Sequence, residues 1–232
     1  MFEMQVRRAH RVAAGEVLLL FAQAAWPQVA PSPAELRAYT GVHRAAHDGD
    51  LRTLAIAPRA SLDARDARGR TPLHVAAVAR RSDGVAALLA AGADPAALDA
   101  DRYDAVTIAA VADDEPTLRA LLAGGASARL MTSRYDGTAL IAAAHLGHAG
   151  VVRQLIAAGA PLDHANNLHW TALIEVVVLG DGGPRHQATL QALLDAGADH
   201  RLADREGRTP LQLARSHGYS AMVAMLERAG AK

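Results

Sequence analysis

The sequence contains no cysteine among its 232 residues. This absence excludes disulfide frameworks, thiolate zinc sites and cysteine nucleophiles, but it leaves the compartment open because a cysteine-free chain is stable in either redox environment. Aromatic residues make up only 3% of the chain, whereas hydrophobic residues make up 51%. A core of this composition must be aliphatic and rich in alanine, whose small side chain lets helices approach closely.

Lysine is nearly absent as well, since Lys232 is the only one and the other basic residues are arginines. The formal net charge is zero. A nucleic-acid partner is therefore not expected, because proteins that bind polyanions usually carry a basic excess. No apolar run is long enough to span a bilayer, so we expect no membrane partner either.

The first 31 residues carry an ambiguous signal. Three arginines within 7–11 precede an apolar run at 17–21 and small residues at 22–24, an order typical of a signal peptide. Glu16 interrupts the apolar segment, so a capping helix or a disordered tail is the alternative. We favour a cytoplasmic protein, and a periplasmic or secreted one in stress tolerance or host contact if this segment is a signal peptide.

A Gly-Ala pair recurs along the rest of the chain, each time after an apolar segment. Its five copies begin at Gly92, Gly125, Gly159, Gly197 and Gly230, with spacings of 33, 34, 38 and 33 residues. A Thr-led motif precedes four of the copies, at Thr71, Thr138, Thr171 and Thr209, and a degraded form begins at Asp104. Self-similarity at this period predicts a stack of repeated helical units.

The unit at 66–98 shows why these residue types recur. Thr71 can cap a helix, because its hydroxyl accepts a hydrogen bond from an unpaired backbone N–H. Pro72 then occupies the first helical position, where a missing N–H costs nothing. Gly92 can end the second helix in a left-handed conformation. Two short helices cannot bury their apolar faces alone, so the units must stack on one another.

The run Thr71-Pro72-Leu73-His74 and the 33-residue period resemble the ankyrin repeat. The resemblance covers residues 36–232, and stretches at 135–144 and 170–175 resemble a bacterial subset of that family. It implies an all-α solenoid of stacked helix-turn-helix units with short β-hairpin finger loops. We expect six repeats, at 32–65, 66–98, 99–132, 133–165, 166–203 and 204–232. The first is a divergent cap that opens with a capping-box spacing at Ser32 and Glu35.

The resemblance also implies a function, since partners of ankyrin-like proteins usually bind the concave side that the fingers and inner helices form. Tyrosine, tryptophan and arginine are enriched in binding hot spots. We therefore predict a protein-binding module that is not an enzyme, needs no cofactor and is a monomer. The predicted contact residues are Arg68, Arg70, Arg102, Tyr103, Arg134, Tyr135, His145, His169, Trp170, Glu175 and Arg208.

Glu175 stands at a position that is apolar in the other units. A buried carboxylate is costly unless it is paired, so a structural bond with a neighbour such as His145 competes with presentation of the charge to a ligand. A metal-binding or enzymatic site at His145, His164 and Glu175, or zinc held with Asp163, is the alternative function. No P-loop, zincin or nucleophile-elbow motif accompanies these residues.

Five extra residues lengthen the fifth repeat around 179–186, where four of the eight residues are glycine or proline. We interpret them as a longer surface loop between the two helices, which surface loops tolerate well. A loop that contacts the partner is one alternative, and a phosphate site on backbone N–H groups is another, although no preceding strand and no Walker-type lysine support the latter.

Overall fold

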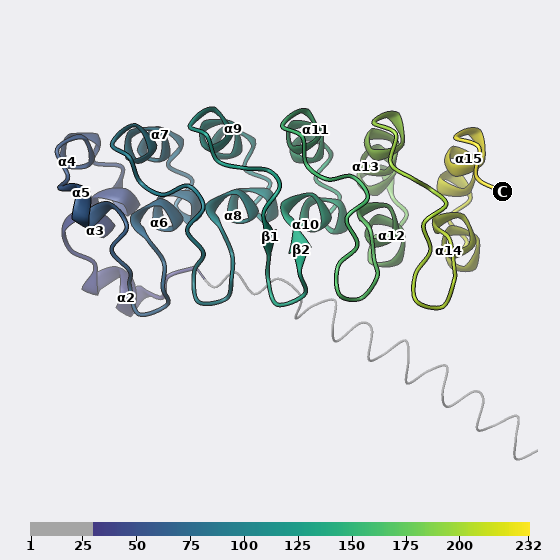
Figure 1. Cartoon of the computed structure of the whole chain (residues 1–232), viewed down its shortest axis with the longest axis horizontal. Helices are drawn as coiled ribbons and strands as arrows, with labels where there is room; N and C mark the ends of the chain where they lie inside the picture. The colour runs from purple at the N-terminus through teal and green to yellow at the C-terminus, as the bar shows by residue number, and fades with distance from the viewer. Residues whose placement is uncertain (1–29) are drawn as a thin grey trace, which may run out of the picture.

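The computed structural model describes residues 30–232, so the expected signal peptide or capping helix lies almost wholly outside the described residues. Helices stack in two parallel rows along one axis (Figure 1). The inner row is the one on the side of the finger loops. It consists of α3 (Gly41–Asp48), α6 (Pro72–Val78), α8 (Ala105–Val111), α10 (Ala139–His145), α12 (Ala172–Val178) and α14 (Pro210–His217). The outer row consists of α4 (Leu51–Ala55), α7 (Ser82–Ala90), α9 (Glu115–Ala123), α11 (Ala149–Ala157), α13 (Pro184–Asp195) and α15 (Ser220–Arg228).

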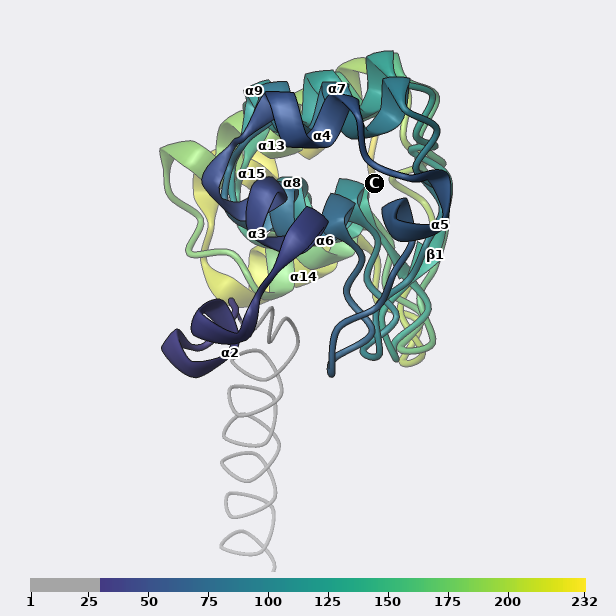
Figure 2. The ribbon, with the colours of Figure 1, turned by 90° about the vertical axis from the view of Figure 1, so that its left-hand side faces the viewer.

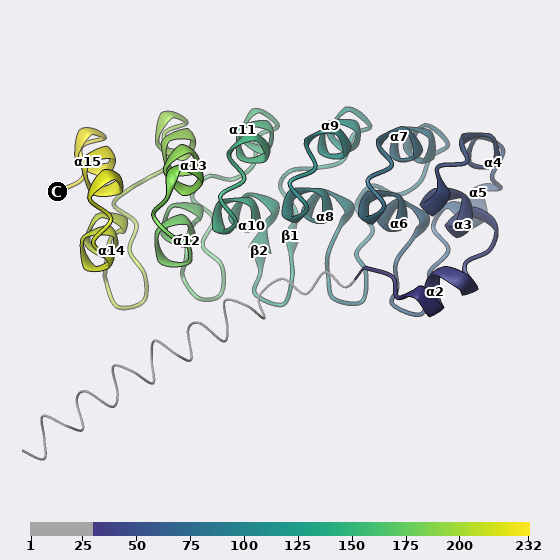
Figure 3. The ribbon, with the colours of Figure 1, turned by 180° about the vertical axis from the view of Figure 1, so that it is seen from behind.

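The remaining elements are short. Helix α2 (Pro33–Ala38) precedes the first pair, α5 (Arg59–Leu62) follows it, and strands β1 (Met131–Thr132) and β2 (Gly137–Thr138) form one antiparallel hairpin in register Met131 to Thr138. The same order of pairs is visible from behind (Figure 3). The expected all-α ankyrin-type solenoid is confirmed. No helix within residues 30–232 is long and apolar enough to cross a membrane.

The inner helices begin where the sequence places a capping side chain. Asp104, Thr138, Thr171 and Thr209 each accept a hydrogen bond from the backbone N–H three residues later. Pro72 and Pro210 stand in the first turn. These caps satisfy N–H groups that have no partner inside the helix.

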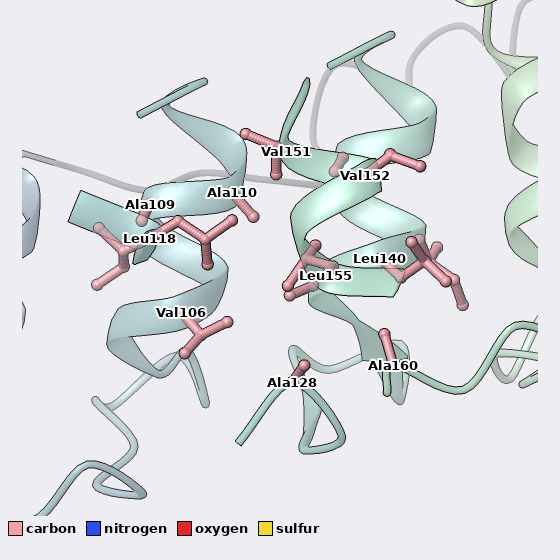
Figure 4. Packing of buried hydrophobic residues seen from close by; sticks show 14 of the residues in the cluster. Val106, Ala109, Ala110, Leu118, Ala128, Leu140, Val151, Val152, Leu155 and Ala160 are labelled. Carbon is pink, nitrogen blue, oxygen red and sulfur yellow. The ribbon is translucent and has the colours of Figure 1, made fainter. Parts of the chain in front are cut away.

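Aliphatic side chains form one continuous core that runs from Tyr39 to Leu226. At the junction of the third and fourth repeats, for example, Leu118 and Leu155 of the outer helices meet Val106 and Leu140 of the inner helices (Figure 4). All four side chains are fully buried. Each repeat covers the apolar face of the next one, so no single repeat contains a complete core.

His74 adds polar contacts between repeats to the apolar packing of the core. Its Nδ1 accepts a hydrogen bond from the backbone N–H of Thr71 at 3.2 Å, and its Nε2 lies 3.0 Å from the carbonyl oxygen of Tyr103 in the next repeat. The ring must therefore be neutral, with its proton on Nε2. The side chain is fully buried, and this burial lowers the pKa of His74.

The fifth repeat uses its five extra residues in two ways. The inner and outer helices of the second to fourth repeats are joined by three residues, whereas residues 179–183 join α12 to α13. Helix α13 is also longer, at 12 residues against 9 for α7, α9 and α11. The expectation that all five residues lengthen the loop is thus wrong: Pro184 starts a new helical turn, and three residues extend the helix.

Polar contacts close both ends of the described array. In the first repeat, Ser32 and Glu35 form the expected capping box, each side chain bonding to the other's backbone N–H at 3.2 and 2.8 Å. At the other end, Arg215 of α14 donates to Glu227 of α15 at 2.7 Å. These polar contacts stabilise the first and sixth repeats of the described array.

The buried neutral state of His74 predicts a pH-dependent stability. The unfolded chain protonates this histidine below pH about 6.5, whereas the folded chain, whose His74 pKa is lowered, resists protonation until lower pH. The free energy of unfolding should therefore fall as the pH drops from 7.5 to 5.5. Urea unfolding at both pH values measures the loss.

His74→Gln is the matched variant, since Gln212 occupies the equivalent position of the last repeat and accepts from the backbone N–H of Thr209 at 3.0 Å. It should lose less stability than the wild-type chain over the same pH interval. An unchanged slope in His74→Gln would contradict the assignment.

Candidate partner-binding fingers

Five loops of five residues each, here called fingers, lead into the inner helices of the second to sixth repeats. They comprise residues 66–70, 99–103, 133–137, 166–170 and 204–208. Seen along the array, they project side by side from one edge of the stack (Figure 2). Strand pairing is assigned only to the third finger among the described residues. The other four close through a backbone bond from the first residue to the fifth, such as Asp66 N–H to Arg70 O at 3.0 Å.

The first residue of every finger folds the loop with its own side chain. In the first finger, Asp66 Oδ1 accepts from the backbone N–H groups of Arg68 and Arg70 at 2.8 and 2.9 Å. Asp99, Asn166 and Asp204 accept the equivalent pair of bonds, and Ser133 accepts one of them. Short polar side chains stabilise turns in this way. The recurrence of Asp or Asn at this position is visible in the sequence, so this role could have been predicted.

Hydrogen bonds also tie neighbouring fingers together. Ala100 N–H donates to Arg68 O, Ser133 N–H to Arg102 O, and Asn167 N–H to Tyr135 O, each at 2.9 Å. The side chain of Arg205 continues the series by donating to Asn167 O. The tips therefore form one continuous row rather than five independent loops.

Several predicted contact residues lie exposed on this row. Arg68, Arg102, Arg134, His169 and Arg208 are exposed, and Tyr135 and Trp170 are half-buried. Arg102 pairs with Asp136 at 3.3 Å and Arg134 with Asp101 at 3.7 Å, in both cases across neighbouring fingers. Exposed pairs of this kind add little stability, so these arginines can exchange partners at little cost.

Arg70 is not a contact residue, because its side chain is only 3% exposed. Its guanidinium donates to Asp66 at 2.7 Å and to Glu35 of the α2 cap at 2.6 Å, while Tyr39 donates to the same Asp66 oxygen at 2.7 Å. Burial alone would raise the pKa of Asp66, but these hydrogen bonds hold it below its ordinary value. Arg70 therefore anchors α2 to the first finger.

Tyr103, the equivalent residue of the second finger, is also buried, at 3% exposure. Burial raises its pKa to about 12. The fifth residue of a finger precedes the inner helix, so its side chain can turn inward and pack. The prediction that Tyr103 contacts a partner is therefore wrong.

Glu175 and His145 form an internal network. Glu175 is 4% exposed, accepts from Asn166 Nδ2 at 3.0 Å, and lies 3.3 Å from His145 Nδ1. The structural pairing with His145 is thus confirmed, and a partner contact through Glu175 is excluded by its burial. His145 itself exposes only a tenth of its side chain. Together they hold Asn166, which shapes the fourth finger.

The proposed metal cluster does not assemble. His164 Nε2 lies 2.6 Å from the carbonyl oxygen of Asp136 in the third finger. Within residues 30–232, no group of three or more His, Asp and Glu side chains is arranged to hold a metal ion.

Three fingertips carry backbone strain. The fourth residue of every finger has a positive φ, and the first and fifth fingers place Gly69 and Gly207 there, at 72° and 75°. The second, third and fourth fingers place Arg102, Asp136 and His169 there instead, at 64°, 52° and 62°. A side chain in this region costs about 1 kcal/mol relative to glycine. Strain of this kind tends to persist where the side chain is needed.

The sequence reasoning missed an exposed apolar residue on the row. Leu168, the third residue of the fourth finger, is 37% exposed. Tyr135 holds the same position in the third finger, so the two tips present neighbouring apolar groups. Comparison of equivalent finger positions could have found this pair.

Two family models match the chain. The model for ankyrin repeats in three copies matches residues 106–201, and that for a single ankyrin repeat matches residues 68–100. Domains of this type are typically protein–protein interaction modules and are generally non-enzymatic scaffolds.

Known proteins agree with these matches. The putative ankyrin repeat protein YahD of Escherichia coli (strain K12) is 34% identical over 190 residues, covering 81% of this chain and 94% of that protein. A solved ankyrin repeat domain from Acinetobacter baumannii AYE is 42% identical, with a TM-score of 0.77 over 82% of this chain and 98% of that one. The ankyrin repeat domain of Bcl-3, an IκB family member, is 29% identical, with a TM-score of 0.73 over 84% and 87%. The chain belongs to the ankyrin-repeat family.

Proposed function

We propose that this chain binds another protein through the tips of its fingers. The observation that carries the proposal is the strained backbone of Arg102 and His169. Glycine would fit both positions without strain, as it does at Gly69 and Gly207. The exposed side chain of Arg102 contributes little to folding stability, because its ion pair with Asp136 is solvated.

The composition of the row supports the same function. Tyr135 and Leu168 supply an apolar centre on adjacent fingers, and Arg102, Arg134 and Arg205 surround it. Interfaces typically combine buried apolar anchors with a polar rim, and arginine is enriched among hot spots. Since hydrogen bonds already order the row, binding would require little further loss of conformational entropy.

Substitutions at the strained tips should change folding stability and partner binding in opposite directions. Arg102→Gly and His169→Gly should each raise the free energy of unfolding by about 1 kcal/mol, because they relieve the left-handed strain. The double variant should also bind the partner at least tenfold more weakly, since two contact side chains of about 1 kcal/mol each are lost. Thermal unfolding and titration of the partner captured by the wild-type chain measure the two effects.

A double variant that is more stable and binds as tightly as wild type would refute the assignment. Arg80→Gly is the matched control, because Arg80 also has a positive φ of 56° but lies between α6 and α7, away from the fingers. It should keep the wild-type affinity, and it controls for affinity alone because the variant also loses the hydrogen bond from Arg80 to Ala112 O at 2.6 Å.

The apolar centre of the row can be tested separately. Tyr135→Ala combined with Leu168→Ala should weaken the captured complex about tenfold or more, because truncating hot-spot residues costs above 1 kcal/mol each. Neither side chain is fully buried, so the variant should remain folded. Ile56→Ala, which removes an apolar side chain that is 83% exposed in the first repeat, should leave affinity unchanged. If the wild-type chain, the double variant and Ile56→Ala bind the partner equally tightly, Tyr135 and Leu168 are not part of the interface.

A further inference from the structure

The extra residues of the fifth repeat lie on the side of the stack opposite to the fingers (Figure 2). Residues 179–186 are here called the bracket. A longer loop in a solenoid need touch nothing beyond its own repeat. The bracket instead contacts the third, fourth and sixth repeats, through a different residue in each case.

The contact with the third repeat skips one unit. Arg185 donates to Asp113 Oδ2 at 3.2 Å, although a whole repeat separates the two. Gly147 of the intervening repeat lets Arg185 and His186 pack closely against it. A Cβ at this position would lie only 3.3 Å from Arg185 Cβ and 3.2 Å from the ring of His186. Asp113 itself adopts a positive φ of 54° at the turn that it occupies.

His186 makes the contact with the fourth repeat. Its Nε2 lies 3.0 Å from the carbonyl oxygen of His145, at the end of α10. Its Nδ1 lies 2.8 Å from Asp181 Oδ1, which also accepts from the backbone N–H of Gly183 at 2.8 Å. The bond from Gly183, followed by that from His186, lowers the pKa of Asp181. These bonds fold the bracket onto the helix end.

Tyr219 makes the contact from the sixth repeat. Its hydroxyl donates to the carbonyl oxygen of Gly180 at 2.8 Å. Its ring lies so close to Gly182 that a Cβ there would stand 2.4 Å from a ring carbon. Gly182 also has a φ of 69°. Gly182 is therefore required by close contact with Tyr219, and not only by the turn.

We propose that the bracket joins the third to sixth repeats into one cooperative unit. Repeats in a solenoid ordinarily contact only their neighbours, so stability is a sum of nearest-neighbour terms and the last repeat can open alone. The bracket adds a link from the fifth repeat to the third, and it packs Gly182 and the carbonyl group of Gly180 against Tyr219 of the sixth. It acts at the ends of the inner helices that lie away from the fingers, and so fixes the spacing of the second to fifth fingers.

Native-state hydrogen exchange of the full chain in increasing urea tests the proposal. In the wild-type chain, the slowest amides of α8, α12 and α14 should exchange through one opening, with the same free energy and the same urea dependence. Arg185→Ala combined with Tyr219→Phe removes both outer links and leaves the core intact. In this variant α8 and α14 should open separately from α12 and exchange about threefold to tenfold faster.

Arg153→Ala is the control, since Arg153 is exposed on α11 of the intervening repeat. It should keep the single wild-type opening. Separate openings of α8 and α14 in the wild-type chain would overturn the proposal. So would exchange in the double variant that matches the control, because the outer links would then carry no coupling.

Discussion

Burial of the aliphatic face of one repeat against the next is the interaction on which the rest of the molecule depends. The core extends without interruption from Tyr39 to Leu226, and each buried methylene contributes about 0.8 kcal/mol. Alanine is frequent in it because small side chains allow neighbouring helices to approach. A short pair of helices is unstable alone, so the register of every finger follows from the stacking of its repeat.

Polar groups direct this apolar stack. Asp66 and its equivalents fold each finger with a side-chain oxygen, and His74 bonds one repeat to the backbone of the next. The fingers then bond to one another through their backbones. The outcome is an ordered row whose tips present side chains that the fold does not use, and this order supports a role as a preformed binding surface.

The sequence was sufficient for the fold, because Thr caps and Gly-Ala helix ends are local signals with a repeated spacing. The burial and the partners of individual side chains were harder to predict from the sequence. Arg70 and Arg68 stand in the same finger, yet Arg70 is covered by Glu35 from 35 residues earlier, and no local pattern reveals that partner. The extra residues near 179–186 likewise look like a plain loop until their distant contacts are seen.

The central claim is that the fingertips, and not the outer helices, meet the partner. Hydrogen-exchange mass spectrometry of the chain, alone and in complex with its captured partner, tests this most directly. The account predicts slower exchange at the tips around residues 101–103, 134–136 and 167–169, with α9, α11 and α13 unchanged. Slower exchange confined to the outer helices would contradict it.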